Sequence, residues 1–224
     1  MKKTIDFLKQ LKSNNNRDWF QNNKKTYQES HEEVIQFADS LLERMNEFDK
    51  IETASGSKSL FRIYRDIRFS KDKTPYKTSR SGSFRRAGAD RRGGFYFSIE
   101  PGNTMIGGGF YQPNKEDLEL IRRHIELDAT ELRKVLKSKQ FKNYYGDLRG
   151  EQLKTAPKGF EKDDPNIDLL KFKGFYVMHT FSDAEVLSEN FLDNVVEGYK
   201  ILLPYFNIMT DFLTTNLNGE SLLD

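Results

Sequence analysis

The side chains best suited to chemistry lie between Arg62 and Tyr76, where arginines and lysines alternate with two aspartates. A guanidinium group can hold a phosphate or carboxylate through two parallel hydrogen bonds, and an ammonium group adds a point charge. Fixed cations of this kind also stabilise negative charge that develops during a reaction. The stretch therefore predicts a site that binds an anionic or phosphorylated ligand, and it leaves open whether the ligand is turned over.

The candidate residues fall into three roles. The predicted ligand-binding residues are Arg62, Arg68, Asp72, Lys73, Lys77 and Tyr96. The candidate catalytic residues, if a reaction takes place, are Asp66 as a base or orienting group and Tyr76 as a hydroxyl donor. Alternation of polar and apolar residues predicts a strand over residues 60–69, which places Arg65 on the apolar face with Ile63 and Ile67. We predict a structural role for Arg65, because a buried guanidinium needs a buried partner.

Two other interpretations remain open at this stage. Asp66 and Asp72 could pair with the same arginines in a purely structural network. The pairs Arg85–Arg86 and Arg91–Arg92, interleaved with aromatic residues, could instead contact a nucleic acid or an acidic partner, although no recognisable nucleic-acid-binding module is present. The stretch Gly107–Gly109 lacks the pattern of a phosphate-binding loop and predicts a tight bend or a close backbone approach.

Composition limits the remaining classes of function. The chain has 224 residues, no cysteine and three scattered histidines, so we expect no disulfide, no metal site and no cofactor. It has no apolar run long enough for a membrane span and no signal peptide, which predicts a cytoplasmic protein of bacterial type. Residues 58–92 carry twelve Lys/Arg against three Asp, a net of +9, and residues 161–224 carry four against twelve Asp/Glu, a net of −8. The basic block would attract anions, unless the two blocks neutralise each other. Oligomeric state is left open.

Hydrophobic periodicity predicts the elements that position these residues. We expect one α+β domain over 1–224, with a central antiparallel or mixed sheet flanked by N-terminal and C-terminal helices. The predicted regions are a helical part over 1–50, a strand and hairpin core over 58–112, a helical part over 114–140, and a strand followed by helices over 173–218. The polar run over residues 13–16 offers an asparagine N-cap for the helix that follows it, and Asn114 is placed to cap a later helix. Ser182–Glu185 forms a capping box, and Pro204 is expected to break or kink the last helical region.

The basic segment also resembles the signature R-x-x-R-D-x-R-F-x-x-[D/N]-K-x-x-Y of a mainly bacterial family, the domain of unknown function 2461 family. The fixed positions of that signature are Arg62, Arg65, Asp66, Arg68, Phe69, Asp72, Lys73 and Tyr76. Phe7–Leu8, Asn15–Phe20, Gly107–Gly109 and Pro157–Phe160 are similar to other stretches of the family. The resemblance implies a shared fold and supports the location of the site, and it implies no particular activity.

Overall fold

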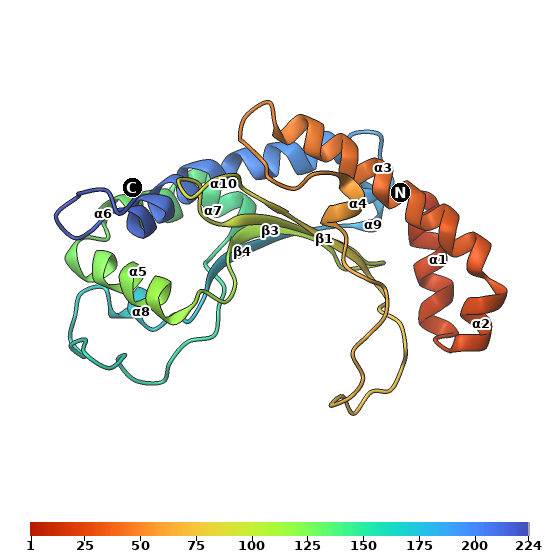
Figure 1. The fold of residues 1–224 in the computed structure, drawn as a ribbon, viewed down its shortest axis with the longest axis horizontal. Helices are drawn as coiled ribbons and strands as arrows, with labels where there is room; N and C mark the ends of the chain where they lie inside the picture. Colours follow the sequence, from red (N-terminus) through yellow and green to blue (C-terminus); the bar gives the residue numbers. More distant parts are fainter. Residues whose placement is uncertain (224) are drawn as a thin grey trace. The chain divides into compact units, whose positions relative to one another are not determined.

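The computed structural model describes residues 1–223, and these form an α+β fold with ten helices and a four-stranded antiparallel sheet (Figure 1). The helices are α1 (Lys2–Ser13), α2 (Arg17–Asn22), α3 (Lys24–Met45), α4 (Gly56–Ser59), α5 (Lys115–Leu127), α6 (Thr130–Lys137), α7 (Lys139–Tyr145), α8 (Ile167–Leu170), α9 (Asp183–Val186) and α10 (Phe191–Thr214). The strands are β1 (Arg80–Arg85), β2 (Gly94–Ile99), β3 (Thr104–Phe110) and β4 (Phe175–Phe181). The predicted fold class is confirmed.

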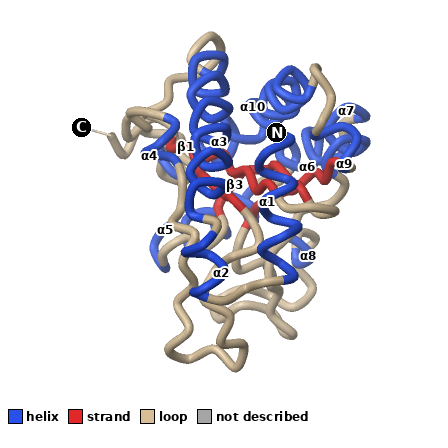
Figure 2. The backbone as a smooth tube through the Cα atoms, turned by 90° about the vertical axis from the view of Figure 1, so that its right-hand side faces the viewer, coloured by secondary structure: helices blue, strands red, loops and turns tan. Residues whose placement is uncertain are grey.

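The N-terminal region is helical, as its periodicity predicts. The apolar stripe of α1 is fully buried and includes Ile5, Phe7, Leu8 and Leu11. The Asn16 side chain accepts a hydrogen bond of 2.9 Å from the backbone N–H of Trp19, so the asparagine N-cap expected in the run 13–16 is present and is Asn16. Helices α1 and α2 both pack against α3 (Figure 2). This packing fixes the turn between α1 and α2, on which part of the candidate site depends.

The strands follow one another in the sheet in the order β1-β2-β3-β4. The Gly107–Gly109 stretch lies within β3, where a Cβ atom on Gly107 would come within 2.0 Å of the Val177 carbonyl oxygen of β4. Only glycine allows this approach, so the predicted close contact between backbones is confirmed. The predicted N-cap of α5 is also confirmed, because Asn114 accepts a hydrogen bond of 2.7 Å from the Asp117 N–H.

The strand predicted over residues 60–69 was wrong. Leu60 and Tyr64 form only isolated bridges, to Gly82 and Tyr76, and the rest of the segment is loop. The ladder cannot lengthen past Tyr76, because the next residue on that side is Pro75, which has no backbone N–H. The strand next to β2 is instead β1, which the alternation of polar and apolar residues did not predict.

The C-terminal region also differs in part from the prediction. The capping box of Ser182 and Glu185 is present, but the helix that it starts, α9, ends at Val186. Helix α10 begins at Phe191 and continues through Pro204, so of the break or kink predicted at this proline, the break was wrong. A proline removes one backbone hydrogen bond of a helix. Here the flanking residues Tyr205 and Phe206 are fully buried, and their burial outweighs that loss.

The chain divides into two compact units, each built from separated stretches of sequence. Unit 1 comprises Met1–Phe84, Tyr96–Ile106 and Thr180–Glu197, and unit 2 comprises Arg85–Phe95, Gly107–His179 and Gly198–Asp224. The whole segment between α4 and β1, with its basic motif, belongs to unit 1. Among residues 1–223, no helix has the length and apolar character needed to cross a membrane.

Candidate functional site

The basic motif lies on a long loop between α4 and β1, residues 60–79, which we call the motif loop (Figure 1). The loop doubles back on itself at the Tyr64–Tyr76 bridge. Two backbone hydrogen bonds flank this bridge, from Arg65 N to Pro75 O at 2.9 Å and from Lys77 N to Ile63 O at 2.8 Å. The two halves of the loop are therefore held together at their base.

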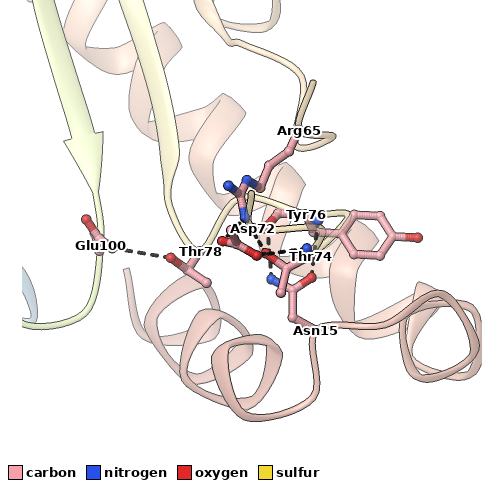
Figure 3. Close-up of polar contacts among 7 residues, drawn as sticks. All are labelled: Asn15, Arg65, Asp72, Thr74, Tyr76, Thr78 and Glu100. Carbon is pink, nitrogen blue, oxygen red and sulfur yellow. Dashed lines mark hydrogen bonds and ion pairs between the residues drawn. The ribbon is translucent and has the colours of Figure 1, made fainter. Parts of the chain in front are cut away.

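The base of the motif loop is fastened to the turn between α1 and α2. The Asn15 side chain donates to the Tyr76 carbonyl at 2.9 Å and accepts from the Tyr76 N–H at 3.1 Å (Figure 3). The Tyr76 ring is 6% exposed and stacks on Phe20 with ring centres 4.0 Å apart. Ile63 is buried in the same cluster. Local sequence alone does not predict this attachment, because 61 residues separate Asn15 from Tyr76.

This position bears on the candidate role of Tyr76 as a hydroxyl donor. Burial raises the pKa of Tyr76, and the neighbouring Tyr64 raises this pKa further by a smaller amount. Figure 3 shows the ring pointing away from Arg65 and Asp72. The side chain thus serves mainly to anchor the loop, at a distance from the charged groups of the motif.

Arg65, Asp72 and Thr74 form a network at the centre of the motif loop (Figure 3). The guanidinium of Arg65 donates to both Asp72 and Thr74. Asp72 also accepts from the Thr74 N–H and hydroxyl, each at 2.9 Å. These bonds, with the Thr74 N–H first and Arg65 next, lower the pKa of Asp72 to about 2. Arg65 is half-buried and its partner Asp72 is exposed, so the expectation of a buried arginine with a buried partner was wrong.

Arg68 and Asp66 form a separate pair on the outer part of the motif loop. The carboxylate of Asp66 accepts from Arg68 Nε at 3.0 Å and from Nη2 at 2.7 Å, a bidentate arrangement. The side chains are 77% and 45% exposed. The side-chain bonds from Arg68 lower the pKa of Asp66, with a smaller contribution from Arg62. A carboxylate stabilised in this way is a weak proton acceptor, which reduces its value as a general base.

An open hollow of about 610 Å³ lies between the motif loop and the start of α2. It is lined by Asn15, Asn16, Arg17, Ile67, Asp72, Lys73, Thr74 and Pro75. Arg17 is exposed, and Lys73 donates only to the Ile67 carbonyl, at 2.9 Å. Among the described residues neither cation is paired with a carboxylate, since Asp72 is bound to Arg65 and Thr74. The hollow therefore presents two cations that no carboxylate neutralises.

The structure separates the predicted ligand-binding residues into different places. Asp72 and Lys73 line the hollow, and Arg68 lies in its own ion pair. Lys77 and Tyr96 lie instead beside the ring of Phe61, the residue that precedes Arg62. The Lys77 Nζ is 5.8 Å from the centre of the Phe61 ring, and the centre of the Tyr96 ring is 6.5 Å from it. Sequence reasoning missed Arg17 as a site residue. The resemblance of the stretch Asn15–Phe20 to the family pattern was the signal that could have found it.

Arg86 and Arg92, one from each arginine pair singled out in the sequence, form contacts within the protein. In unit 2, Arg86 is 5% exposed, donates to the Arg92 carbonyl at 3.0 Å and lies over the Phe206 ring at 4.9 Å. Arg92 in turn forms an ion pair with Asp117 at 2.5 Å. These contacts give both arginines a structural role in unit 2. Within residues 1–223, no three histidine, aspartate or glutamate side chains are grouped so that they could hold a metal ion.

Comparison with known proteins gives one match. Residues 3–207 match the model of a family described as conserved hypothetical protein (DUF2461). No curated protein and no solved structure matches the chain. The match spans the hollow, the motif loop and the sheet, so the geometry described above lies inside the region that defines the family.

Proposed function

We propose, from the premise that the chain belongs to the DUF2461 family of conserved hypothetical proteins, that its motif loop binds a small phosphorylated or otherwise anionic ligand. The ligand occupies the hollow between the motif loop and α2. The observation that carries the proposal is the pair of cations there, Arg17 and Lys73, which no carboxylate in the described chain neutralises.

The chemistry of the hollow suits an oxyanion. Arg17 offers a planar fork that can bind two oxygens at once, and Lys73 adds a mobile point charge. The competing structural interpretation accounts for Arg65 and Asp72, which hold the loop in shape. It does not account for Arg17 and Lys73, which form no ion pair with any residue of 1–223. We propose binding as the function and assign no reaction to it.

The proposal also names the partner, and the lack of cysteine bears on the compartment. A small anionic ligand is the expected partner, and a nucleic acid is the alternative. We keep the cytoplasm as the proposed compartment, because a chain without cysteine has none of the disulfides that secreted proteins commonly use.

The only tryptophan, Trp19, lies two residues after Arg17 and supplies a local fluorescence signal. Wild-type protein is titrated with a panel of nucleotides and sugar phosphates, and Trp19 emission and melting temperature are recorded. We expect at least one compound to change both signals. The substitutions Arg17→Gln and Lys73→Met should each weaken its binding about tenfold, as expected for the loss of a charged hydrogen bond of about 1.5 kcal/mol.

The matched control is Lys71→Met, which removes an exposed lysine of the motif loop that does not line the hollow. This variant should bind as the wild type does. A panel without any hit, or a hit that Lys73→Met binds with unchanged affinity, contradicts the proposal.

A further inference from the structure

Arg80, the first residue of β1, is a buried arginine whose partners within residues 1–223 are all uncharged. Its side chain is 2% exposed. It donates to the Phe61 carbonyl at 3.1 Å, faces His31 Nδ1 at 3.0 Å and lies 6.0 Å from the centre of the Tyr27 ring. Its Nε is buried without any hydrogen-bond partner among the described residues. The positive charge of Arg80 is thus not neutralised by the protein groups around it.

This arrangement is unusual for an arginine. A guanidinium group stays charged in proteins, and a charge removed from water is normally paired with a carboxylate. The uncharged oxygen and nitrogen atoms around Arg80 satisfy part of its hydrogen-bonding capacity and none of its charge. An uncompensated charge in a poorly screened environment acts over a longer distance than one at the surface.

Two further cations, Lys77 and Arg62, belong to the part of the motif loop next to Arg80. Lys77 is half-buried, with its Nζ 5.8 Å from the centre of the Phe61 ring. Burial, followed by the charges of Arg62 and Arg80, lowers the pKa of Lys77. Within residues 1–223 none of the three cations forms an ion pair with a carboxylate. The charge of Arg62 lowers the pKa of Asp66, but Asp66 forms its ion pair with Arg68.

This place is open to solvent on its outer side. Arg62 is exposed, and Phe61 is 43% exposed, which is high for a phenylalanine. An approaching anion could therefore reach the ends of Arg62 and Lys77 without rearrangement of the core. The open apolar ring beside the two cations would accommodate the uncharged part of such a ligand.

We propose that Lys77, beside the ring of Phe61, and the exposed Arg62, which follows Phe61 in the chain, bind a phosphate group. Arg80 acts from behind as a positioning residue that attracts the anion through its charge, without contacting it. The inference does not rest on the proposed function, because none of these residues lines the hollow. The phosphate group could belong to free inorganic phosphate or to a nucleotide, and the two sources can be distinguished.

The test is a titration of isotope-labelled full-length protein with potassium phosphate, at constant ionic strength kept with potassium chloride. Amide signals are followed by NMR. We expect the largest shifts at Phe61, Arg62 and Lys77, and a higher melting temperature in phosphate than in chloride. A second titration with adenosine monophosphate identifies the source: tighter binding than phosphate indicates a nucleotide, and equal binding indicates free phosphate.

Lys77→Met and Arg62→Gln should each weaken phosphate binding at this place by tenfold or more. Lys171→Met is the matched control, since Lys171 is also half-buried and has no carboxylate partner among the described residues. Lys73→Met should leave these shifts intact, which separates this inference from the proposed site in the hollow. If Lys77→Met binds phosphate as tightly as the wild type, the inference is wrong.

Arg80 is tested by a pair of variants. Arg80→Lys keeps the charge and should retain most of the binding, whereas Arg80→Met keeps much of the volume and should lose it. Equal binding by both folded variants would exclude the role proposed for Arg80. If neither variant folds, the Arg62 and Lys77 variants decide the question of the phosphate site.

Discussion

At the scale of single residues, the contact between His31 and Arg80 fixes the protonation state of the histidine. An arginine can only donate hydrogen bonds, so His31 Nδ1 must accept from it, and the imidazole is neutral with its proton on Nε2. Burial first, and then the charge of Arg80, lower the pKa of His31 below its ordinary value of 6.5, while Glu32 on the same helix opposes this. The ring of Tyr27 stacks against the imidazole, 5.6 Å away.

This contact predicts a loss of stability at mildly acidic pH. Because the pKa of His31 is lower in the folded than in the unfolded protein, the unfolded chain takes up the proton first as pH falls below 6.5. The contribution of His31 is therefore fully present above that pH and decreases below it. Urea unfolding at pH 7.5 and 5.5 should show a fall in stability that is smaller in His31→Gln.

The control for this prediction is His124→Gln in unit 2. The ring nitrogen of His124 faces the Thr215 carbonyl oxygen at 3.0 Å, so this histidine lies against a different partner from the Arg80 guanidinium. This substitution should leave the fall in stability between the two pH values unchanged. A fall of equal size in the wild type and in His31→Gln would refute the prediction.

The candidate site was only partly predictable from the sequence at this scale. The density of cations located the motif loop, and Asp72 and Lys73 do line the hollow. Arg17 and Arg80 were missed, because their importance depends on neighbours far away in the sequence. Arg80 meets His31 across 49 residues, and no local pattern reports that the strand which begins at Arg80 buries its first side chain.

At the scale of elements, Asn15 is the connection between the α1–α2 turn and the motif loop. Its amide pairs with both backbone groups of Tyr76, in the way that a neighbouring strand would. Replacing it with alanine leaves a half-buried N–H and a carbonyl without these partners, at a cost of roughly 1–3 kcal/mol. We expect Asn15→Ala to lower the free energy of unfolding by about this amount, measured by urea denaturation.

The neighbouring substitution Asn14→Ala provides the comparison. Asn14 is exposed, and its side chain donates only to the Gln10 carbonyl of its own helix, at 2.9 Å. Its loss should change stability by about 0.5 kcal/mol or less, as for most surface substitutions. Similar effects of the two substitutions would show that Asn15 does not hold the motif loop in place.

Elements were predictable where local signals decide the structure. The helices with asparagine or serine caps begin where the sequence placed them, because a cap depends on residues within one turn. The strand over residues 60–69 failed, because alternation cannot show whether a partner strand is available. Strand β1 contains Ser81, Gly82 and Ser83, which have little preference for strands, and it forms through its pairing with β2.

At the scale of the whole molecule, residues of the basic block (58–92) and the acidic block (161–224) form separate ion pairs, within the same block or with other parts of the chain. In unit 1, Asp183 and Asp193 of the acidic stretch pair with Lys9 of α1 and Arg44 of α3, at 3.2 Å and 2.9 Å. These carboxylates are engaged with the N-terminal helices and not with the motif loop. Two of the six cations of the loop are paired with its own aspartates. The proposed anionic partner would therefore meet a smaller charge than the sequence suggests.

This reduced charge separates a small-ligand site from a nucleic-acid surface. For single-stranded DNA, the logarithm of the binding constant falls by about 0.7 per neutralised phosphate for each unit of log salt concentration. If Arg17 and Lys73 are the cations in contact, the slope for a fluorescein-labelled oligothymidine should be about −1.4, measured by fluorescence anisotropy from 50 to 300 mM salt. If all six cations of the motif loop contacted phosphates, the slope would be about −4. A slope that steep, reduced in magnitude by about 0.7 in Lys73→Met and in Lys71→Met alike, would favour the nucleic-acid alternative over the binding of a small ligand, because only an extended surface engages both lysines equally.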